Sequence, residues 1–328
     1  MTEVSIKDRK EEAKKAKYKL VPDFPDEFLI DISSVCNHSC TFCANPRMAN
    51  KILMEADNVI RILREGKECG ATQLGLYATG EPFMARNLDQ YVREAKEVGY
   101  DYVYITTNGA GAVPHRAKSV IDAGLDSIKF SIHAGTRETY KKIHGKDDFD
   151  RVIENLKWVH NYRQETGKQY KIYVTIVQTH DNMFELDMLH DIVRPYIDEW
   201  DPHLLTNSCG TMPENNEIGD IEADNIRGRG HKGVCFQPFK SFTVTPEGFM
   251  SACVLDYHKA LVVADLNIVS LADAWSNEVY KNFRRMHVNN KLENTICYNC
   301  RNNTNESFDG LLPEYLERPI APPRRDSE

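Results

Sequence analysis

One unit recurs along the first two thirds of the chain: a short run of β-branched and aromatic residues, a polar turn, then a helical pattern. Strands that alternate with helices imply a parallel sheet, and right-handed crossovers curl such a sheet toward a barrel. The sequence therefore predicts an α/β fold, a partial (β/α)6 TIM-like barrel with its functional loops after the strands. The predicted strands are Phe28–Ser33, Gln73–Ala78, Tyr102–Thr107, Ser127–His133, Lys171–Gln178 and His203–Ser208.

Helical patterns lie between these strands. Two predicted helices, Ala56–Glu68 and Arg86–Glu97, are soon followed by Gly70 and Gly99, which suit the left-handed position after a helix. The longest, Asp148–Thr166, carries apolar residues at helical spacing, so one face is expected to cover the sheet.

The pattern also predicts the division of the chain. Residues 1–27 form an N-terminal extension and residues 28–210 the barrel. Residues 211–233 have no apolar period and are predicted to be a linker or substrate loop. A small module follows at residues 234–305, with a β-hairpin around Pro246-Glu247-Gly248, and the proline-rich residues 306–328 are expected to form an extended strap or a mobile tail.

Composition narrows the function. A hydrophobic fraction of 41% with 27% charged residues is ordinary for a soluble protein, and no apolar stretch is long enough to span a membrane. The charged N-terminus lacks the features of a secretory signal, so we expect a cytoplasmic protein. A net charge of −8 argues against nucleic acid as a partner, and nine cysteines in a reducing compartment favour metal or redox chemistry.

Cys36, Cys40 and Cys43 form a Cys-x3-Cys-x2-Cys group directly after the first predicted strand, with Phe42 before the third cysteine. Three thiolates on a short loop can hold three irons of a [4Fe-4S] cubane and leave the fourth iron open to another ligand. A structural zinc, completed by His38, or three free cysteines are the alternatives. They are less favoured, because ligand sites of such folds lie at strand ends, where this group stands.

The group resembles the signature of the radical S-adenosylmethionine (SAM) superfamily. The resemblance implies that the cluster binds SAM and that an outside electron donor, such as flavodoxin or ferredoxin, drives its cleavage to a 5′-deoxyadenosyl radical. Gly80-Glu81-Pro82 resembles the family's motif that contacts the SAM amino group, for which a carboxylate is suited.

Softer matches to the family follow the later strands. The resemblance extends to Asn108 after the third strand and to Lys129 on the fourth. It implies that Ser131 makes a polar contact with the SAM ribose and that Val177 supports the adenine. Both could equally be ordinary strand residues.

Cys235, Cys253, Cys297 and Cys300 form a second group, Cys-x17-Cys followed by Cys-x2-Cys. Four thiolates make a closed site that suits either zinc or a fully ligated [4Fe-4S] cluster. The arrangement is similar to the truncated "twitch" form of the SPASM domain, in which a hairpin separates the first two cysteines. That resemblance implies one auxiliary [4Fe-4S] cluster.

Two cysteines remain. Cys69 stands at a helix end and is expected to be a buried structural thiol. Cys209 follows the sixth predicted strand, where substrate is expected, so a catalytic role as a hydrogen donor stands beside a structural one. Among the histidines, His133 at the end of the fourth strand is the best placed, although a lone histidine is more often a hydrogen-bonding residue than a base.

The leading expectation is an oxidoreductase that takes hydrogen from a carbinol carbon of a small polar substrate, a sugar or an aminocyclitol, and passes an electron to the auxiliary cluster. This is similar to the dehydrogenases of 2-deoxy-scyllo-inosamine. One alternative is an epimerase with Cys209 as the hydrogen donor. Another is a peptide-modifying enzyme, ranked lower because about 27 residues precede the first strand. The last alternative is a protein that carries iron-sulfur clusters or transfers electrons without catalysing a reaction.

Overall fold

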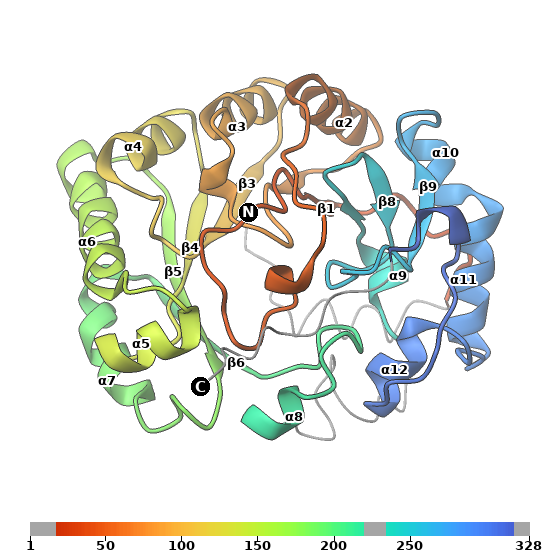
Figure 1. The fold of residues 1–328 in the computed structure, drawn as a ribbon. Coiled ribbons are helices and arrows are strands. Elements are labelled where there is room, and N and C mark those ends of the chain that lie inside the picture. The colour runs from red at the N-terminus through yellow and green to blue at the C-terminus, as the bar shows by residue number, and fades with distance from the viewer. Residues whose placement is uncertain (1–17, 220–233, 318–328) are drawn as a thin grey trace.

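The computed structural model describes residues 18–219 and 234–317. In this part of the chain nine strands form one sheet in the order β6-β5-β4-β3-β2-β1-β7-β8-β9 (Figure 1). The six strands of the barrel pair in parallel throughout. They are β1 (Glu27–Ile30), β2 (Gln73–Gly75), β3 (Tyr102–Thr107), β4 (Ser127–Ser131), β5 (Lys171–Gln178) and β6 (Glu199–Leu204).

Helices cover the outer face of this parallel sheet (Figure 1). Apolar side chains such as Ile105, Phe130 and Val174 are fully buried in the core that includes the helical residues Leu63 and Leu156. The predicted partial α/β barrel is confirmed. The helices of this part are α2 (Ala56–Glu68), α3 (Leu88–Glu97), α4 (Pro114–Asp122), α5 (Arg137–His144), α6 (Phe149–Thr166) and α7 (Leu186–Val193), with the 3-10 turns η1 (Asn45–Arg47), η2 (Pro82–Met84) and η3 (Arg194–Tyr196).

The sixth strand is displaced from its predicted position. The sequence pattern placed it at His203–Ser208, whereas β6 runs over Glu199–Leu204. Pro202 lies inside the strand and cannot donate a hydrogen bond, which argued against a strand there. In the structure β6 pairs with β5 alone, at the end of the sheet, and an edge strand tolerates a proline.

The C-terminal module extends the same sheet on the other side of β1. Strand β7 (Thr243–Val244) pairs in parallel with β1, so that Leu29 lies opposite Thr243. Strands β8 (Phe249–Ser251) and β9 (Val262–Asp265) continue it in antiparallel fashion, and the predicted hairpin is confirmed. The other elements are α8 (Asn215–Ile218), α9 (Gln237–Lys240), α10 (Leu271–Ser276), α11 (Glu278–Val288), α12 (Ile296–Asn302) and the turn η4 (Pro313–Tyr315).

A buried arginine joins the module to the segment before β1. Arg284 on α11 donates hydrogen bonds to the carbonyls of Pro238 (2.7 Å), Trp275 (2.8 Å) and Leu20 (3.0 Å). Its guanidinium lies 3.7 Å from the ring centre of Tyr280 and 4.1 Å from that of Trp275. The described end of the N-terminal extension is therefore fixed to the C-terminal module.

The described part of the proline-rich tail is held by Lys259. The Lys259 Nζ lies 2.6 Å from Glu317 and 2.7 Å from Glu247. The amide of Leu311 also donates to the carbonyl of Ala260. Residues 306–317 therefore pack against the module, while residues 318–328 and the predicted loop residues 220–233 are outside the described residues. Within the described ranges, each helix is too short or too polar to cross a bilayer.

Candidate metal centres

The first three cysteines lie on the loop that follows β1, and this loop is anchored on both sides. On one side the amides of Ser39 and Thr41 donate to carbonyls at the C-terminal end of α5, those of His144 (3.0 Å) and Ile143 (2.9 Å). On the other side the buried Asn45 amide group donates to the carbonyls of Ser34 (2.7 Å) and Thr79 (2.8 Å). The backbone that carries the three thiols is therefore fixed by the barrel.

Gly80 allows the next strand-end loop to lie directly against this one. A Cβ at position 80 would lie 2.1 Å from the carbonyl oxygen of Ser33 and 2.7 Å from that of Val35. The neighbouring amide of Glu81 donates to the carbonyl of Val35 at 2.9 Å. Only a glycine fits such a close approach of two backbones.

Amide groups point at two of the three sulfur atoms. The backbone N–H of His38 donates to Cys36 Sγ (3.5 Å) and that of Asn45 to Cys43 Sγ (3.4 Å). Burial raises the pKa of Cys36 to about 11, and it also raises the pKa of Cys40 and Cys43. Buried thiols lose their protons when a metal binds, and the N–H donors then stabilise the thiolate charge.

The described residues fit a cluster better than a single ion. Among them, no three His, Cys, Asp or Glu side chains converge closely enough for one metal ion. A cubane does not need such convergence, because its four irons hold the thiolates apart. The donor set of three thiolates, with hydrogen-bond donors to the sulfurs, suits the open [4Fe-4S] cluster that the sequence predicts.

Glu81 lies beside this loop and is almost fully buried. Its carboxylate accepts hydrogen bonds from the Thr107 hydroxyl (2.7 Å) and from the backbone amides of Asn108 (2.7 Å) and Phe83 (3.1 Å). Burial raises the pKa of Glu81 to about 7 despite these bonds. The carboxylate is thus oriented beside the cysteine loop, in a place where a bound ammonium would stabilise its ionised form.

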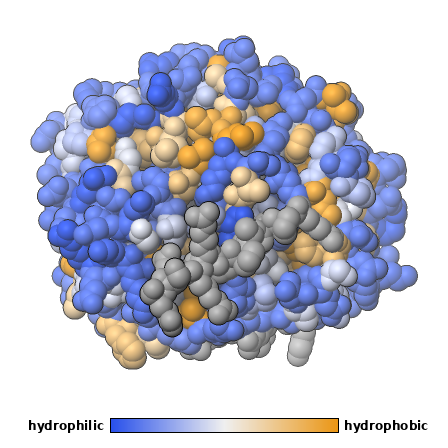
Figure 2. All heavy atoms as spheres, viewed as in Figure 1, coloured by the Kyte–Doolittle hydropathy of each residue, from blue (hydrophilic) through white to orange (hydrophobic). Residues whose placement is uncertain are grey.

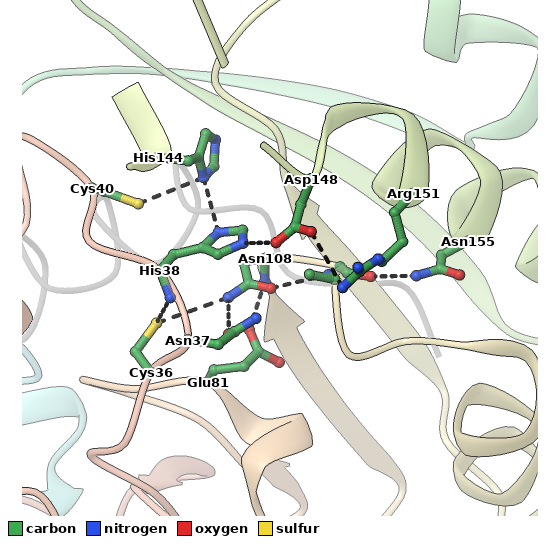
Figure 3. A network of polar contacts seen from close by, with 12 residues as sticks. Cys36, Asn37, His38, Cys40, Glu81, Asn108, His144, Asp148, Arg151 and Asn155 are labelled. Carbon is green, nitrogen blue, oxygen red and sulfur yellow. Dashed lines mark hydrogen bonds and ion pairs between the residues drawn. The ribbon is translucent and has the colours of Figure 1, made fainter. Parts of the chain in front are cut away.

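Asn108 joins the loop after β3 to the cysteine loop. Its side-chain amide lies 2.7 Å from Asn37 Oδ1 and 3.8 Å from Cys36 Sγ, and its carbonyl oxygen accepts from the amide of Ala110 (Figure 3). The structure thus brings Glu81 and Asn108 to the first cysteine group.

A chain of polar side chains reaches Cys40 from the other side (Figure 3). Asp148 Oδ2 lies 3.1 Å from His38 Nε2, and His38 Nδ1 lies 3.3 Å from His144 Nδ1, which is 3.6 Å from Cys40 Sγ. His144 Nε2 accepts the backbone amide of His133 at 3.2 Å. Since burial lowers the pKa of His144 well below its usual range, the ring is neutral and its one proton lies on Nδ1, toward Cys40 and His38.

The other predicted cofactor residues lie on β4 and β5. Lys129 and Ser131 alternate with the fully buried Ile128 and Phe130, so they lie on the face of the sheet away from the helices. Val177 on β5 donates its amide to His133 Nδ1 at 3.0 Å. Lys129 Nζ lies 2.7 Å from Asp201 on β6 and the ring of His203 3.1 Å from the same carboxylate.

The second cysteine group includes one residue more than the sequence predicts. Cys253, Cys297 and Cys300 interact with one another and with Cys235, as expected. Cys209 is also among them: its side chain is buried and interacts with those of Cys253, Cys297 and Cys300. This thiol was expected at the mouth of the barrel, and the structure instead brings it to the C-terminal module.

The two cysteine groups are linked through Tyr257. The hydroxyl of this buried side chain lies 3.8 Å from Cys43 Sγ, and its loop follows Cys253 directly. Asp256 shapes that loop by accepting the amides of Ala260 (2.9 Å) and Leu261 (2.8 Å). The module with the second group therefore reaches the first.

Three of these neighbours could not be found from the sequence. His144, Tyr257 and Cys209 are far along the chain from the cysteines that they contact, and none of them belongs to a local motif. The only signal was indirect: Cys209 follows a strand and precedes Gly210, which suggests a tight turn.

Two family models match the chain. Residues 30–192 match the model of the radical SAM superfamily, and residues 235–301 match that of the SPASM iron-sulfur cluster-binding domain. A curated relative, a "probable GTP 3′,8-cyclase" from Saccharolobus solfataricus, is 36% identical over 135 residues. The match takes in 40% of this chain and only 42% of the relative's length.

Solved structures share the fold. BtrN in complex with AdoMet and 2-DOIA has a TM-score of 0.59 at 19% identity, over 88% of this chain and 98% of BtrN. Streptococcus suis SuiB, bound to its precursor peptide SuiA, has a TM-score of 0.62 at 19% identity, over 94% of this chain and 74% of SuiB.

Proposed function

The chain is a radical SAM enzyme with a C-terminal SPASM domain, and from this premise we propose that it oxidises a secondary alcohol of a small polar molecule, a sugar or an aminocyclitol. The observation that supports this proposal is the presence of two sets of cysteines. One set lies at the end of β1 and the other in the adjoining module, and the two are linked through Tyr257. When bound, SAM and the two clusters supply a 5′-deoxyadenosyl radical and an electron acceptor.

The side chains at the first group suit the methionine part of SAM. Glu81 offers a buried carboxylate, held by three donors, for the amino group of SAM. We propose that Gly80 and Pro82 set the backbone beside it and that Asn108 keeps the cysteine loop in place. Ser131 and Val177 are the proposed contacts of the ribose and the adenine.

The substrate is proposed to lie on the open face of β4 to β6. Lys129, Asp201 and His203 form a connected set of charged and polar groups there, and each is partly exposed. Such a set suits hydroxyl and amino groups, since fixed polar side chains orient a polar ligand. In Figure 2, apolar side chains gather in the upper middle of the viewed face within a hydrophilic surround.

The comparisons support this choice in part. The BtrN structure was solved with 2-DOIA, and this chain covers nearly all of BtrN. The curated relatives carry the name GTP 3′,8-cyclase, and SuiB was solved with a peptide, so a nucleotide and a peptide are the competing substrates. Flavodoxin or ferredoxin is the proposed electron donor, and the cytoplasm is the proposed location.

The test is anaerobic incubation of the reconstituted enzyme with SAM, a reductant and a panel of aminocyclitols, sugars, GTP and peptides. We expect 5′-deoxyadenosine together with a product two mass units lighter than an aminocyclitol or sugar. A product of unchanged mass that carries solvent deuterium would instead indicate an epimerase. Turnover of only GTP or only peptides would also overturn the proposal.

Two variants test whether the substrate binds on the face of the sheet that carries Lys129. Lys129→Ala should abolish turnover of the substrate while 5′-deoxyadenosine still forms without it, a result that separates the proposed substrate role of Lys129 from the SAM contact that the sequence predicts for it. Lys118→Ala, which breaks an exposed Lys118–Asp122 pair on the outer helix α4, is the matched control and should leave turnover unchanged. Equal losses in the two variants would contradict a role for Lys129 in substrate binding.

A further inference from the structure

Cys209 lies on a strained loop. Ser208, Cys209 and Gly210 all have positive φ, at 48°, 59° and 80°. Two consecutive residues with a Cβ in the left-handed region are unfavourable, at a cost of roughly 1–3 kcal/mol each, and persist only where the surroundings hold them. Such strain is typical of positions where a side chain must point in one direction.

The surroundings that hold this loop are those of α12, the helix that carries Cys297 and Cys300. Asn207 Nδ2 donates to the carbonyl of Cys300 at 3.0 Å and to Asn303 Oδ1 at 3.1 Å. A Cβ at Gly210 would lie 2.6 Å from the Cβ of Asn299 and 2.8 Å from the backbone nitrogen of Cys300. The loop after β6 is thus fitted against α12 with almost no free space.

The close packing of this loop against α12 brings the thiol of Cys209 to the second cysteine group, which already has four thiols. Cys209 is 3% exposed, and its side chain interacts with those of Cys253, Cys297 and Cys300. Cys235 lies near the same three cysteines, and its thiol accepts a hydrogen bond from the backbone amide of Gln237. A [4Fe-4S] cubane takes one thiolate for each of its four irons, so one of the five is in excess.

We propose that Cys209 is a fifth donor of the auxiliary cluster, able to occupy the ligand position that Cys235 otherwise fills. The iron–sulfur bond to Cys235 breaks as that to Cys209 forms, and the proton of the Cys209 thiol passes to the Cys235 thiolate. The exchange leaves the number of electrons on the cluster unchanged. This inference depends on the auxiliary cluster and not on the reaction proposed above.

The exchange would give the auxiliary cluster a ligand from the barrel itself. Cys253, Cys297 and Cys300 belong to the SPASM domain, whereas Cys209 follows β6, on the side where the substrate is proposed to lie. A thiol bound in this way is not the free hydrogen donor that an epimerase needs. The assignment therefore separates two roles that the sequence alone left open for Cys209.

The test compares three variants of the full chain, Cys209→Ala, Cys235→Ala and the double variant, after anaerobic reconstitution with 57Fe and sulfide. Iron and sulfide are counted, and the clusters are identified by Mössbauer and EPR spectroscopy. We expect the wild type and both single variants to hold about eight irons, two cubanes of four. The double variant should lose about one iron and show a [3Fe-4S] signal.

Cys69→Ala, at the end of helix α2, is the matched control for the loss of a cysteine and should match the wild type. Circular dichroism and the intact spectrum of the SAM-binding cluster check that each variant is folded. If Cys235→Ala already shows the [3Fe-4S] signal, or if its spectra equal those of the double variant, Cys209 is not a ligand. Should Cys209→Ala misfold, Cys209→Ser, alone and with Cys235→Ala, replaces it in the same comparison.

Discussion

His144 Nδ1 lies 3.6 Å from Cys40 Sγ, and it is the atom of that ring that carries the proton. The ring is held between Tyr140, whose centre is 3.9 Å away at 13°, and His133, at 5.0 Å and 12°. A neutral N–H near a cluster sulfur stabilises the more negative, reduced cluster and so raises its reduction potential.

We therefore expect His144→Phe to lower the reduction potential of the SAM-binding cluster by about 40 mV, the equivalent of one hydrogen bond of about 1 kcal/mol in a one-electron couple. The measurement is an EPR-monitored redox titration. His115→Phe, at an exposed position on α4, is the control. An unchanged potential with an intact cluster would show that this N–H does not act on the sulfur.

Glu81→Gln should weaken SAM binding by about 10- to 100-fold, because it removes a charge-assisted hydrogen bond worth about 1.5–3 kcal/mol. The change keeps the shape of the side chain, so the iron content should not fall. Binding is followed by the effect of SAM on the EPR spectrum of the reduced cluster. Glu94→Gln, which breaks a partly exposed pair with Arg64, should bind SAM normally; an equal affinity in both variants would refute the role of Glu81.

Gly80→Ala should reduce the iron content of the first site, because the added Cβ would displace the cysteine loop at Ser33 and Val35. Gly167→Ala is a useful comparison: its φ is positive, at 66°, but a Cβ there meets no atom within 4 Å. That variant should lose only about 1 kcal/mol of stability and keep its iron. Full iron content in Gly80→Ala would mean that the two loops can separate freely.

Arg284→Met should destabilise the fold by about 3–5 kcal/mol, since three buried carbonyls lose their donor and a packed cation is lost. The midpoint of thermal unfolding measures this change. Arg285→Met, one residue further on α11 and exposed, should leave the midpoint almost unchanged. A similar small shift in both variants would argue that Arg284 does not fasten the module.

The buried carboxyl of Asp31 should make the free energy of unfolding depend on pH. Burial raises the pKa of this carboxyl from 3.8 to about 7, although Thr79 donates two hydrogen bonds to it. The folded chain then holds a proton that the unfolded chain releases, so the free energy of unfolding falls as pH rises from about 4 to 7 and levels off above. Asp31→Asn should make this slope shallower in scanning calorimetry between pH 5 and 8, whereas Asp101→Asn, at an exposed position, should not.

The local pattern predicted most of the barrel. Strands β1 to β5 lie where runs of β-branched and aromatic residues predicted them, and the helices between them lie where apolar residues recur at helical spacing. The position of strand β6 was predicted wrongly because the strand contains Pro202, which only an edge strand tolerates. The residues of a strand do not show whether it lies at the edge of the sheet.

The candidate sites divide in the same way. Cysteines with short spacings, such as Cys36 to Cys43, are close in the structure because few residues separate them. The approach of His144 to Cys40 and of Cys209 to Cys300 depends on how distant loops pack, which no local pattern encodes. The sequence therefore predicts the chemistry of each site better than its surroundings.

The parallel pairing of β7 with β1 means that the iron-sulfur module cannot be removed as a separable cassette. A shortened chain that ends before β7 would leave the backbone of Leu29 and Asp31 without the hydrogen bonds that Phe242 and Val244 now accept. Such an open strand invites association with other chains. Exchanging such modules between enzymes of this kind would accordingly require that the contact between β1 and β7 be redesigned along with the cluster site.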